Sequence, residues 1–275
     1  MAKVQKMIWK DKFPKENIYF QMDNGILYYA DCLQIIKKFP EKIFDAVITD
    51  PPYGITACKW DAIIPFNKMW KELKRIRKDN TPIILFGHEP FSSLLRISNL
   101  KEYKYDWYWE KDKGTGAGLS NKQPLRKIEN ILIFYKKQPY YNSQGNKLNR
   151  PYRHVLPLSK NIGNFNISSK NINNYGNRIY RIYTHKKKHN LLYFARDSEK
   201  HHPTQKPVAL LKYLIETYTK ENDLVLDFTC GSGTTLIACE ELNRKWIGIE
   251  IERKYCEIAK KRILKAINKK KLRLF

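Results

Sequence analysis

Short apolar runs bounded by polar or turn-forming residues recur along the chain. The clearest runs lie at residues 44–49, 81–86, 224–228 and 246–249. Nearly continuous hydrophobicity over so few residues is typical of parallel strands that are buried on both faces. Helical periodicity occupies segments between these runs, at residues 66–78, 208–219 and 234–242. Strand alternating with helix predicts an α/β fold in which helices cover both faces of one sheet.

Other segments follow different patterns. Residues 103–109 and 130–135 predict two more strands, a hairpin-like pair at one edge of the sheet. From about residue 137 to residue 200, apolar periodicity fades and Asn, Tyr, Lys, Arg and Ser dominate, which indicates an insertion. It is either a long disordered loop or a module that contacts a ligand or DNA, and its alternating tyrosines and basic residues favour the module. Residues 260–275 predict a basic amphipathic helix, with solvated charges favoured over phosphate contacts.

Charge adds a candidate partner. The chain has 52 Lys and Arg against 27 Asp and Glu, a formal charge of +25. This excess favours a polyanion such as nucleic acid as the substrate, although an AT-rich genome also enriches lysine and asparagine. No apolar run approaches the roughly 20 residues needed to cross a bilayer, and the basic start has no apolar core typical of a signal peptide. We therefore expect a cytoplasmic enzyme with no membrane partner.

The cysteines and histidines indicate neither disulfides nor a metal site. The five cysteines are scattered and never closely paired, so we expect reduced thiols in or near the core. The histidine pairs, His185 with His189 and His201 with His202, have no nearby Cys or Asp partners. We therefore expect no metal.

A glycine-rich turn indicates a nucleoside-binding site. Residues 223–250 are expected to form a strand, the turn, a helix and a second strand, which is half of a Rossmann-like site. Gly231 and Gly233 allow a tight turn, and Glu250 ends the next strand, where a carboxylate can hold ribose hydroxyls. Leu236 stands at the third glycine of the dinucleotide fingerprint, so a nucleoside without pyrophosphate fits better. S-adenosylmethionine is such a ligand, with Asp227 near its amino group; the alternative is a turn that only packs strand against helix.

A rigid acidic turn follows the first predicted strand. It reads Asp50, Pro51, Pro52, Tyr53, and two consecutive prolines restrict its backbone. The Asp50 carboxylate and the Pro51 carbonyl can accept both hydrogens of an exocyclic amine, and Tyr53 offers a face on which a base can stack. Such an amine is buried in a duplex, so the nucleotide would have to be flipped out. A purely structural proline turn is the alternative.

Three motifs together resemble a known family. The Asp50 turn, residues 202–207 (HPTQKP) and residues 227–235 (DFTCGSGTT) look like the amino-group DNA methyltransferases. Their order, with the glycine loop last, resembles the beta class. The resemblance implies a Rossmann-like fold with helices on both faces, a circularly permuted motif order and an inserted target-recognition region. We accordingly expect a catalytic part at residues 1–136, a target-recognition insert at residues 137–202 and a cofactor-binding part at residues 203–275.

The resemblance also assigns site residues. Asp31 matches the acidic residue that contacts the cofactor's adenine amine, and the glycine loop contributes Thr234. Trp109, Lys111 and the segment 114–118 match the wall and mobile loop beside the target base, although that segment also reads as a simple connection. The motif's usual Pro and Phe are replaced here, which puts the contact of Phe228 with the cofactor adenine in doubt. Residues matching those around the methionine carboxylate, where Pro207 is expected to start a helix with free amides, are Thr204, Gln205 and Lys206.

The expected reaction is direct methyl transfer to N6 of adenine in double-stranded DNA. A turn that starts with Asp leans to adenine, because many cytosine-N4 members start with Ser. The alternatives are N4 of cytosine and a non-catalytic DNA-binding protein. Cytosine-C5 chemistry lacks its Pro-Cys motif, and protein-glutamine methylation typically has Asn at the position of Asp50 and the glycine loop upstream of the turn. A homodimer and an accompanying restriction endonuclease remain open as partners.

Overall fold

The computed structural model describes residues 9–54, 61–145, 147–156, 172–175, 178–185 and 189–272. The chain divides into two compact units. The larger combines Met1–Asn142 with Asn190–Phe275, and the smaller is Ser143–His189.

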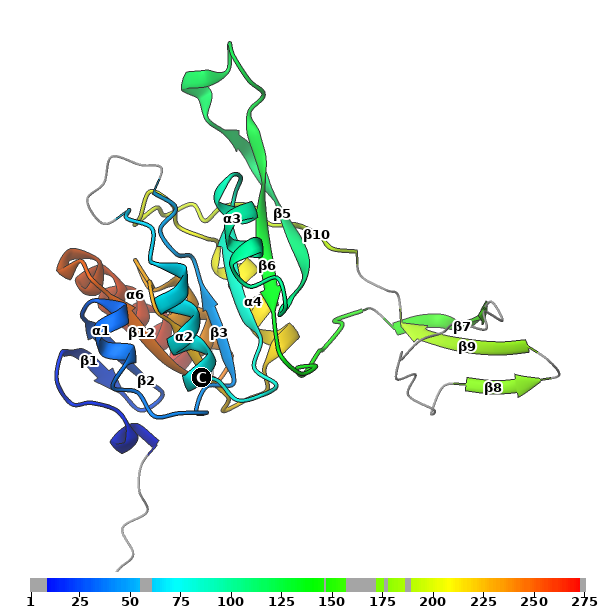
Figure 1. The fold of residues 1–275 in the computed structure, drawn as a ribbon, viewed down its shortest axis with the longest axis horizontal. Coiled ribbons are helices and arrows are strands. Elements are labelled where there is room, and N and C mark those ends of the chain that lie inside the picture. Colours follow the sequence, from blue (N-terminus) through cyan, green and yellow to red (C-terminus); the bar gives the residue numbers. More distant parts are fainter. Residues whose placement is uncertain are drawn as a thin grey trace, which may run out of the picture. The chain divides into compact units, whose positions relative to one another are not determined.

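A mixed sheet forms the centre of the larger unit (Figure 1). Among the described residues it has nine strands, in the order β1-β2-β12-β11-β3-β4-β6-β5-β10. Five neighbouring strands, β2, β12, β11, β3 and β4, run parallel, while β1 and β6 pair antiparallel with the two ends of this block. The bounds are β1 Ile18–Met22, β2 Gly25–Tyr29, β3 Ala46–Thr49, β4 Ile83–Gly87, β5 Tyr103–Thr115, β6 Arg126–Phe134, β10 Leu191–Tyr193, β11 Leu224–Asp227 and β12 Lys245–Glu250. The parallel block places the carboxyl ends of its strands at one edge.

The predicted strands are confirmed, and the edge of the sheet differs from the prediction. Each of the four apolar runs forms one parallel strand, β3, β4, β11 or β12. The hairpin-like pair is β5 and β6, which extend beyond the sheet (Figure 1). It does not form the edge, because β10 pairs with the outer side of β5. The sequence prediction had placed residues 191–193 in the insertion, since a strand of three residues is too short to show periodicity.

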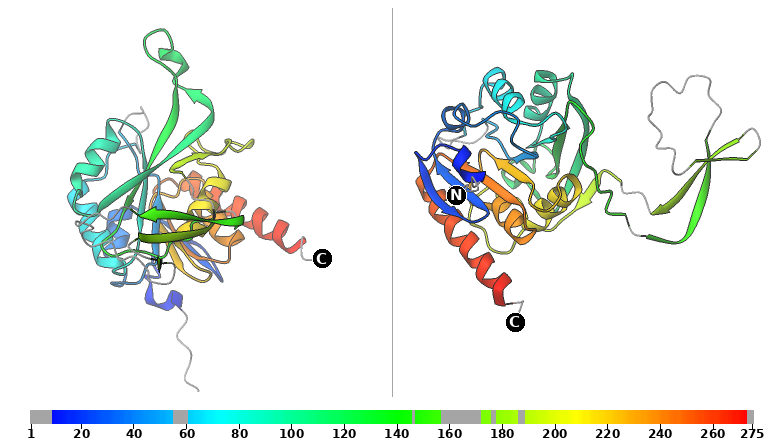
Figure 2. Two further views of the ribbon diagram at one scale, coloured as in Figure 1. Left: turned by 90° about the vertical axis from the view of Figure 1, so that its right-hand side faces the viewer. Right: turned by 90° about the horizontal axis from the view of Figure 1, so that it is seen from below.

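Helices cover both faces of the sheet, as predicted (Figure 2). Alternate strand residues point to opposite faces, so Val47 joins one core cluster, while Ala46 and Ile48 join the other. The cluster of Val47 includes residues of α1, α2 and α3, and the opposite cluster includes residues of α4, α5 and α6. Their bounds are α1 Cys32–Ile36, α2 Phe66–Ile76, α3 Phe91–Ser98, α4 Val208–Tyr218, α5 Thr234–Glu241 and α6 Arg253–Leu272.

Close packing of α5 on β12 explains the departure from the dinucleotide fingerprint. A Cβ atom on Gly248 of β12 would lie 2.5 Å from Cδ1 of Leu236 on α5. The glycine that permits the helix to approach the sheet is therefore on the strand, opposite the leucine. Leu236 replaces the third glycine without pushing α5 away.

The remaining parts of the chain correct several boundaries. Helix α6 starts at Arg253, earlier than the predicted basic helix, because Cys256, Ala259 and Ile263 pack on the core. Its C-terminal end extends past the sheet (Figure 2). The glycine-rich segment 114–118 ends β5 and begins the short 3-10 helix η2, Ala117–Leu119; a second one, η1, is Trp9–Lys12.

The smaller unit is described by itself. Its described residues include three antiparallel strands in the order β7-β9-β8. Their bounds are β7 Lys147–Leu156, β8 Ile172–Tyr175 and β9 Arg178–His185. Paired strands show that the described part of this region is not a long disordered loop, while its contact with a ligand or DNA stays a prediction.

Two further expectations concern cysteines and membranes. Cys230, Cys239 and Cys256 are buried free thiols and Cys32 is partly buried, as expected, while Cys58 lies outside the described residues. Within the described part of the chain, no helix combines the length and the apolar character that a bilayer crossing requires.

Candidate active site

Acidic side chains gather at the carboxyl ends of four neighbouring parallel strands. Asp31 follows β2, Asp50 follows β3, Asp227 ends β11 and Glu250 ends β12. All four line one cavity. Open α/β sheets bind ligands at this edge, so the tertiary structure unites residues that lie far apart in sequence. The other predicted site residues that line the same cavity are Pro51, Pro52, Tyr53, Thr204, Gln205, Lys206, Phe228, Gly231 and Thr234.

The glycine loop has a backbone that only glycine adopts without strain. Gly231 has φ +49° and Gly233, the N-cap of α5, has φ +79°. A Cβ atom on Gly233 would lie 2.8 Å from Cβ of Ala259 on α6. Gly233 therefore does not line the cavity but brings α5 and α6 close together. Gly231 lines the cavity, where an added Cβ would make only ordinary contacts, 3.7 Å from the ring of His202.

Glu250 and Arg262 hold this loop in place. The Glu250 carboxylate accepts hydrogen bonds from the Gly231 amide and the Glu252 amide, both at 2.8 Å. Arg262 on α6 donates from Nη1 to the Ser232 carbonyl at 2.7 Å and to the hydroxyls of Ser232 and Thr234 at 2.9 and 3.2 Å. Arg262 is not predicted from the sequence, because nothing in a basic helix distinguishes a cation that contacts the glycine loop from one that is solvated.

Burial raises the pKa of two cavity carboxyls. The pKa of Asp227 rises to about 6, because burial outweighs hydrogen bonds from Thr235 and Thr49 and the Thr229 amide. The pKa of Glu250 rises to about 7, because burial outweighs its hydrogen bonds from backbone amides. No cation is among the groups that offset this cost. A ligand with positive charge and hydroxyl donors would compensate it.

The first amide of α4 is capped by a carboxylate of the protein itself. Pro207 is the N-cap with φ −66° and ψ 138°, and Val208 is the first helical residue. The Val208 amide points at Asp197, whose two carboxylate oxygens lie 3.3 Å away, so this protein carboxylate already occupies the position. Gln205 also donates to Asp197, at 3.0 Å. A protein carboxylate can accept a hydrogen bond from the first amides of a helix, as an anionic ligand can. The sequence does not show that Asp197 lies at this helix end.

The acidic turn, residues 50–53, is held by contacts from both sides. Thr229 Oγ1 donates to the Asp50 carbonyl at 3.0 Å, which ties the turn to the glycine loop. Asp61 Oδ1 accepts from the amides of Tyr53 and Gly54 at 2.8 and 3.0 Å. The Tyr53 hydroxyl donates to Asp50 Oδ1. The turn therefore owes its rigidity to Asp61 as well as to its prolines, and no sequence motif marks Asp61.

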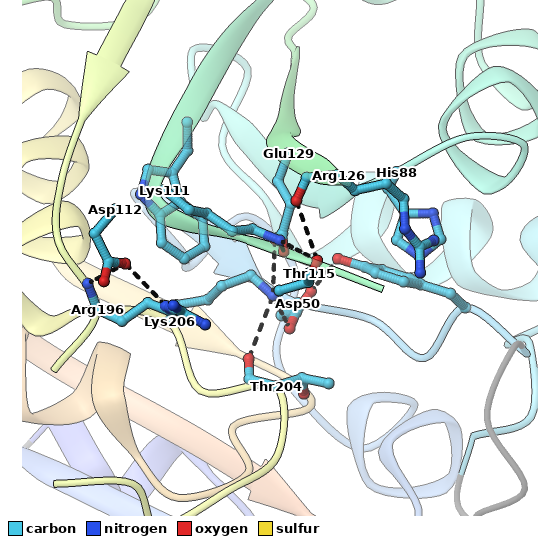
Figure 3. Close-up of polar contacts among 12 residues, drawn as sticks. Asp50, His88, Lys111, Asp112, Thr115, Arg126, Glu129, Arg196, Thr204 and Lys206 are labelled. Carbon is cyan, nitrogen blue, oxygen red and sulfur yellow. Dashed lines mark hydrogen bonds and ion pairs between the residues drawn. The ribbon is translucent and has the colours of Figure 1, made fainter. Parts of the chain in front are cut away.

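A second cavity adjoins the first. Its walls include Tyr53, Trp109, Lys111, Glu129 and Lys206. Trp109 and Lys111 come from β5 and Glu129 from β6, so the root of the hairpin forms one wall (Figure 3). The residues that line both cavities are Tyr53, His202, Thr204, Gln205 and Lys206.

Lys206 lies in a buried charge cluster rather than in a free anion site. Its ammonium pairs with Asp50 Oδ2 and lies 3.3 Å from Glu129 Oε2 (Figure 3). Lys111 pairs with Glu129 Oε1 at 2.6 Å. Thr204 of the same motif contacts a neighbour in the motif instead, since its amide donates to His202 Nδ1 at 3.2 Å.

Within the described part of the chain, no group of three His, Cys, Asp or Glu residues has an arrangement that could hold a metal ion.

Comparison with known proteins decides the family. The model of a DNA methylase family of the N6/N4 type matches residues 44–261, a span that contains the turn, the second cavity and the glycine loop. The chain belongs to this family. It is a site-specific, S-adenosylmethionine-dependent DNA methyltransferase of the N6/N4 family.

Relatives resemble this methylase over most of its length. The type II methyltransferase M2.LlaDCHI of Lactococcus lactis subsp. cremoris is 29% identical over 276 residues, which cover 90% of this chain and 92% of the relative. The type II methyltransferase M2.DpnII of Streptococcus pneumoniae is 26% identical and covers 89% and 91%. Both alignments extend through nearly the whole of each protein.

Solved structures share the fold. The complex of M1.HpyAVI with S-adenosylmethionine matches with a TM-score of 0.58 and 25% identity, covering 86% of this methylase and 99% of that chain. The PvuII DNA methyltransferase, described as cytosine-N4-specific, matches with a TM-score of 0.65 and 17% identity, covering 92% and 95%. The second likeness concerns the fold alone.

S-adenosylmethionine is the cofactor, and the first cavity suits it. The ligand carries an amine and a sulfonium, which are positive, and ribose hydroxyls, which are donors. These groups match the buried carboxyls of Asp227 and Glu250, whose main stabilising contacts among the described residues are hydrogen bonds from hydroxyls and amides. Phe228, 1% exposed, supplies an apolar wall suited to an adenine ring. When bound, the cofactor supplies an electrophilic methyl group.

Proposed function

We propose that this methylase transfers the methyl group to N6 of adenine in double-stranded DNA. The position of Asp50 carries the proposal. Its side chain lines the cofactor cavity, and the two side chains that contact its carboxylate, Tyr53 and Lys206, line both cavities. A base in the second cavity would therefore meet Asp50 beside the cofactor site.

The groups of the turn suit an exocyclic amine. The Asp50 carboxylate and the Pro51 carbonyl are acceptors for its two hydrogens, and accepting both turns the nitrogen lone pair out of ring conjugation. Positive charge develops on the nitrogen as it forms the new bond, and a carboxylate fixed in advance stabilises that charge. The contacts of Asp61 and Thr229 with the turn supply this preorganisation.

The second cavity is the proposed receptor for the flipped base. Extrusion from the duplex costs a few kcal/mol. Stacking on an aromatic ring returns about 1–3 kcal/mol per base. Tyr53 is the ring nearest the carboxylate, and Phe91 supports it with a centroid distance of 4.8 Å. Trp109 lies deeper, because its indole donates to the Phe194 carbonyl at 2.8 Å.

Adenine is proposed over cytosine because the turn starts with Asp, whereas the corresponding turn of many cytosine-N4 members of the family starts with Ser. N4 of cytosine is the alternative. The test is mass spectrometry of nucleosides from DNA incubated with the enzyme and isotopically labelled cofactor. We expect labelled N6-methyladenine. Labelled N4-methylcytosine as the main product would overturn the adenine assignment, and no labelled nucleoside would overturn catalysis.

We assign target recognition to the insert, predicted at residues 137–202, whose compact part is Ser143–His189. Base edges are read by polar side chains, which this region supplies in quantity. The relatives are type II methyltransferases, and we propose the same modification role here. A homodimer and a cognate restriction endonuclease remain proposals, which sedimentation and a digestion test of the methylated DNA would examine.

A further inference from the structure

A chain of alternating charges crosses the wall between the two cavities. In order it consists of Asp50, Lys206, Glu129 and Lys111 (Figure 3). These residues come from four places in the fold, namely the end of β3, the segment before α4, β6 and β5. The two positive and two negative side chains together have no net charge. Removing any one of them leaves a neighbouring charge without one of its partners.

Both oxygens of the Asp50 carboxylate are held within this arrangement. Oδ1 accepts from the Tyr53 hydroxyl, and Oδ2 accepts from the Lys206 ammonium. Each carboxylate oxygen has a second lone pair, so Asp50 can still accept a hydrogen from a substrate amine. The two donors fix the plane in which the remaining lone pairs point.

Burial makes the Lys206 contact stronger than a surface ion pair. The side chain of Lys206 is 7% exposed and that of Glu129 is 14% exposed, so water and salt screen this contact poorly. Glu129 Oε2 forms an ion pair with Lys206 but no hydrogen bond. Glu129 therefore holds the ammonium near Asp50 by charge, while its other oxygen is anchored by Lys111 at 2.6 Å.

We infer that Lys206 and Glu129 are positioning residues for methyl transfer: Lys206 keeps the Asp50 carboxylate ionised and directed at the target amine, and Glu129 holds the Lys206 ammonium beside it. This inference rests on the proposed function of Asp50. It gives Lys206 a different task from the one that the family resemblance implied, the binding of the cofactor's carboxylate.

The charges that act on Asp50 predict shifts of opposite sign. Burial raises the pKa of Asp50, the charge and hydrogen bond of Lys206 lower it, and Glu129 raises it. The other titratable groups facing Asp50 are Tyr53 of the same turn and Asp227 of β11. Because turnover needs ionised Asp50, the rate falls as the pH drops through this pKa. Removing Lys206 must move that fall to higher pH, and removing Glu129 must move it to lower pH.

The experiment compares Lys206→Met and Glu129→Gln with the wild type in single-turnover methylation across pH, at saturating DNA and cofactor. An opposite charge beside a buried carboxylate favours its ionised form, so we expect the acidic limb of the Lys206→Met profile to move to higher pH. The acidic limb of the Glu129→Gln profile should move to lower pH. Lys206→Arg should keep the wild-type limb. Lys212→Met is the matched control, since Lys212 pairs with Glu241 at 2.9 Å and lines neither cavity.

Calorimetric titration with cofactor separates the alternatives. If Lys206→Met weakened cofactor binding tenfold or more and left the acidic limb in place, Lys206 would be a cofactor ligand and the inference would fail. Shifts of the same sign in both variants would also contradict it. If Lys206→Met did not fold, Glu129→Gln alone would decide by the direction of its shift. Nucleoside mass spectrometry of the wild-type product tests the adenine assignment independently, because these shifts are expected with either base.

Discussion

The Thr49 hydroxyl at the end of β3 donates a hydrogen bond of 2.6 Å to the Asp227 carboxylate at the end of β11. The Thr49 and Thr229 hydroxyl oxygens lie 2.7 Å apart, and Thr229 Oγ1 donates to the Asp50 carbonyl. These threonines join the Asp227 carboxyl in the first cavity to the turn that carries Asp50. The two halves of the site therefore share one polar seam, although 178 residues separate Thr49 from Asp227.

Thr49→Val should weaken cofactor binding, because valine has nearly the shape of threonine but cannot donate to Asp227. This bond favours the ionised form of Asp227, which a cationic ligand needs, so we expect its loss to raise the dissociation constant by up to roughly tenfold. Calorimetric titration measures it. Thr81→Val is the matched control, since buried Thr81 donates to the Phe44 carbonyl at 2.6 Å outside the cofactor cavity. Equal cofactor affinity in both variants would refute the role of this seam.

Asp50→Ala should reduce turnover far more than binding. Loss of one preorganised electrostatic contact costs about 10²–10³ in kcat, which is roughly 3–4 kcal/mol. Cofactor affinity should stay close to that of the wild type, because Asp227 and Glu250 are assigned to the cofactor. Stacking on Tyr53 should preserve base flipping, which 2-aminopurine fluorescence at the target position reports. Single-turnover methylation within threefold of the wild type would remove Asp50 from the mechanism.

The two glycines of the loop should differ in their tolerance of a side chain. Alanine in a left-handed conformation costs about 1–2 kcal/mol at either position. Gly233→Ala adds a clash 2.8 Å from Cβ of Ala259, and such overpacking typically costs about 1–3 kcal/mol more. Urea unfolding should therefore rank Gly233→Ala as less stable than Gly231→Ala. Gly118→Ala, with no atom within 4 Å, should match the wild type. The reverse ranking would contradict the packing of α5 on α6.

Cofactor affinity should rise with pH near neutrality. The pKa of Asp227 is about 6 and that of Glu250 about 7 in the free protein, so both carboxyls are partly protonated there. A cationic ligand favours their ionised forms, so binding should release protons and strengthen from about pH 5 to about pH 8. Calorimetry in buffers of different ionisation enthalpy counts the protons. Glu250→Gln should remove the upper part of the dependence, and a flat profile would disprove the coupling.

Exchanging residues 143–189 for the corresponding segment of a relative should change the methylated sequence while the transfer chemistry persists. Sequencing of the methylation pattern reads the result directly. A hybrid that methylates the original sequence would place recognition in the larger unit. Cofactor titration of the hybrid is the control, because its cavity residues come from the larger unit.

The parallel strands, the helices between them and the two main motifs followed from the sequence. Each depends on local chemistry. The apolar run before Asp50 is typical of a buried strand, two prolines restrict the turn after it, and Gly231 and Gly233 permit a backbone that other residues avoid. Asp50, Asp227 and Glu250 were predicted for the same reason, since each ends a strand that periodicity reveals.

The partners of those residues were decided by the tertiary structure. From the sequence alone Lys206 is expected to bind an anion of the ligand, but β6 places Glu129 beside it. The start of α4 is likewise expected to have free amides, but the Val208 amide donates to Asp197. Arg262 and Asp61 accordingly hold the glycine loop and the acidic turn through hydrogen bonds that no sequence spacing predicts. A backbone preference is a property of a few consecutive residues, whereas the charge state and orientation of a buried side chain depend on every element packed around it. Local preferences therefore indicate which residues stand at the ends of the strands. Only the folded chain shows how Asp50 is held, because its contacts come from several elements.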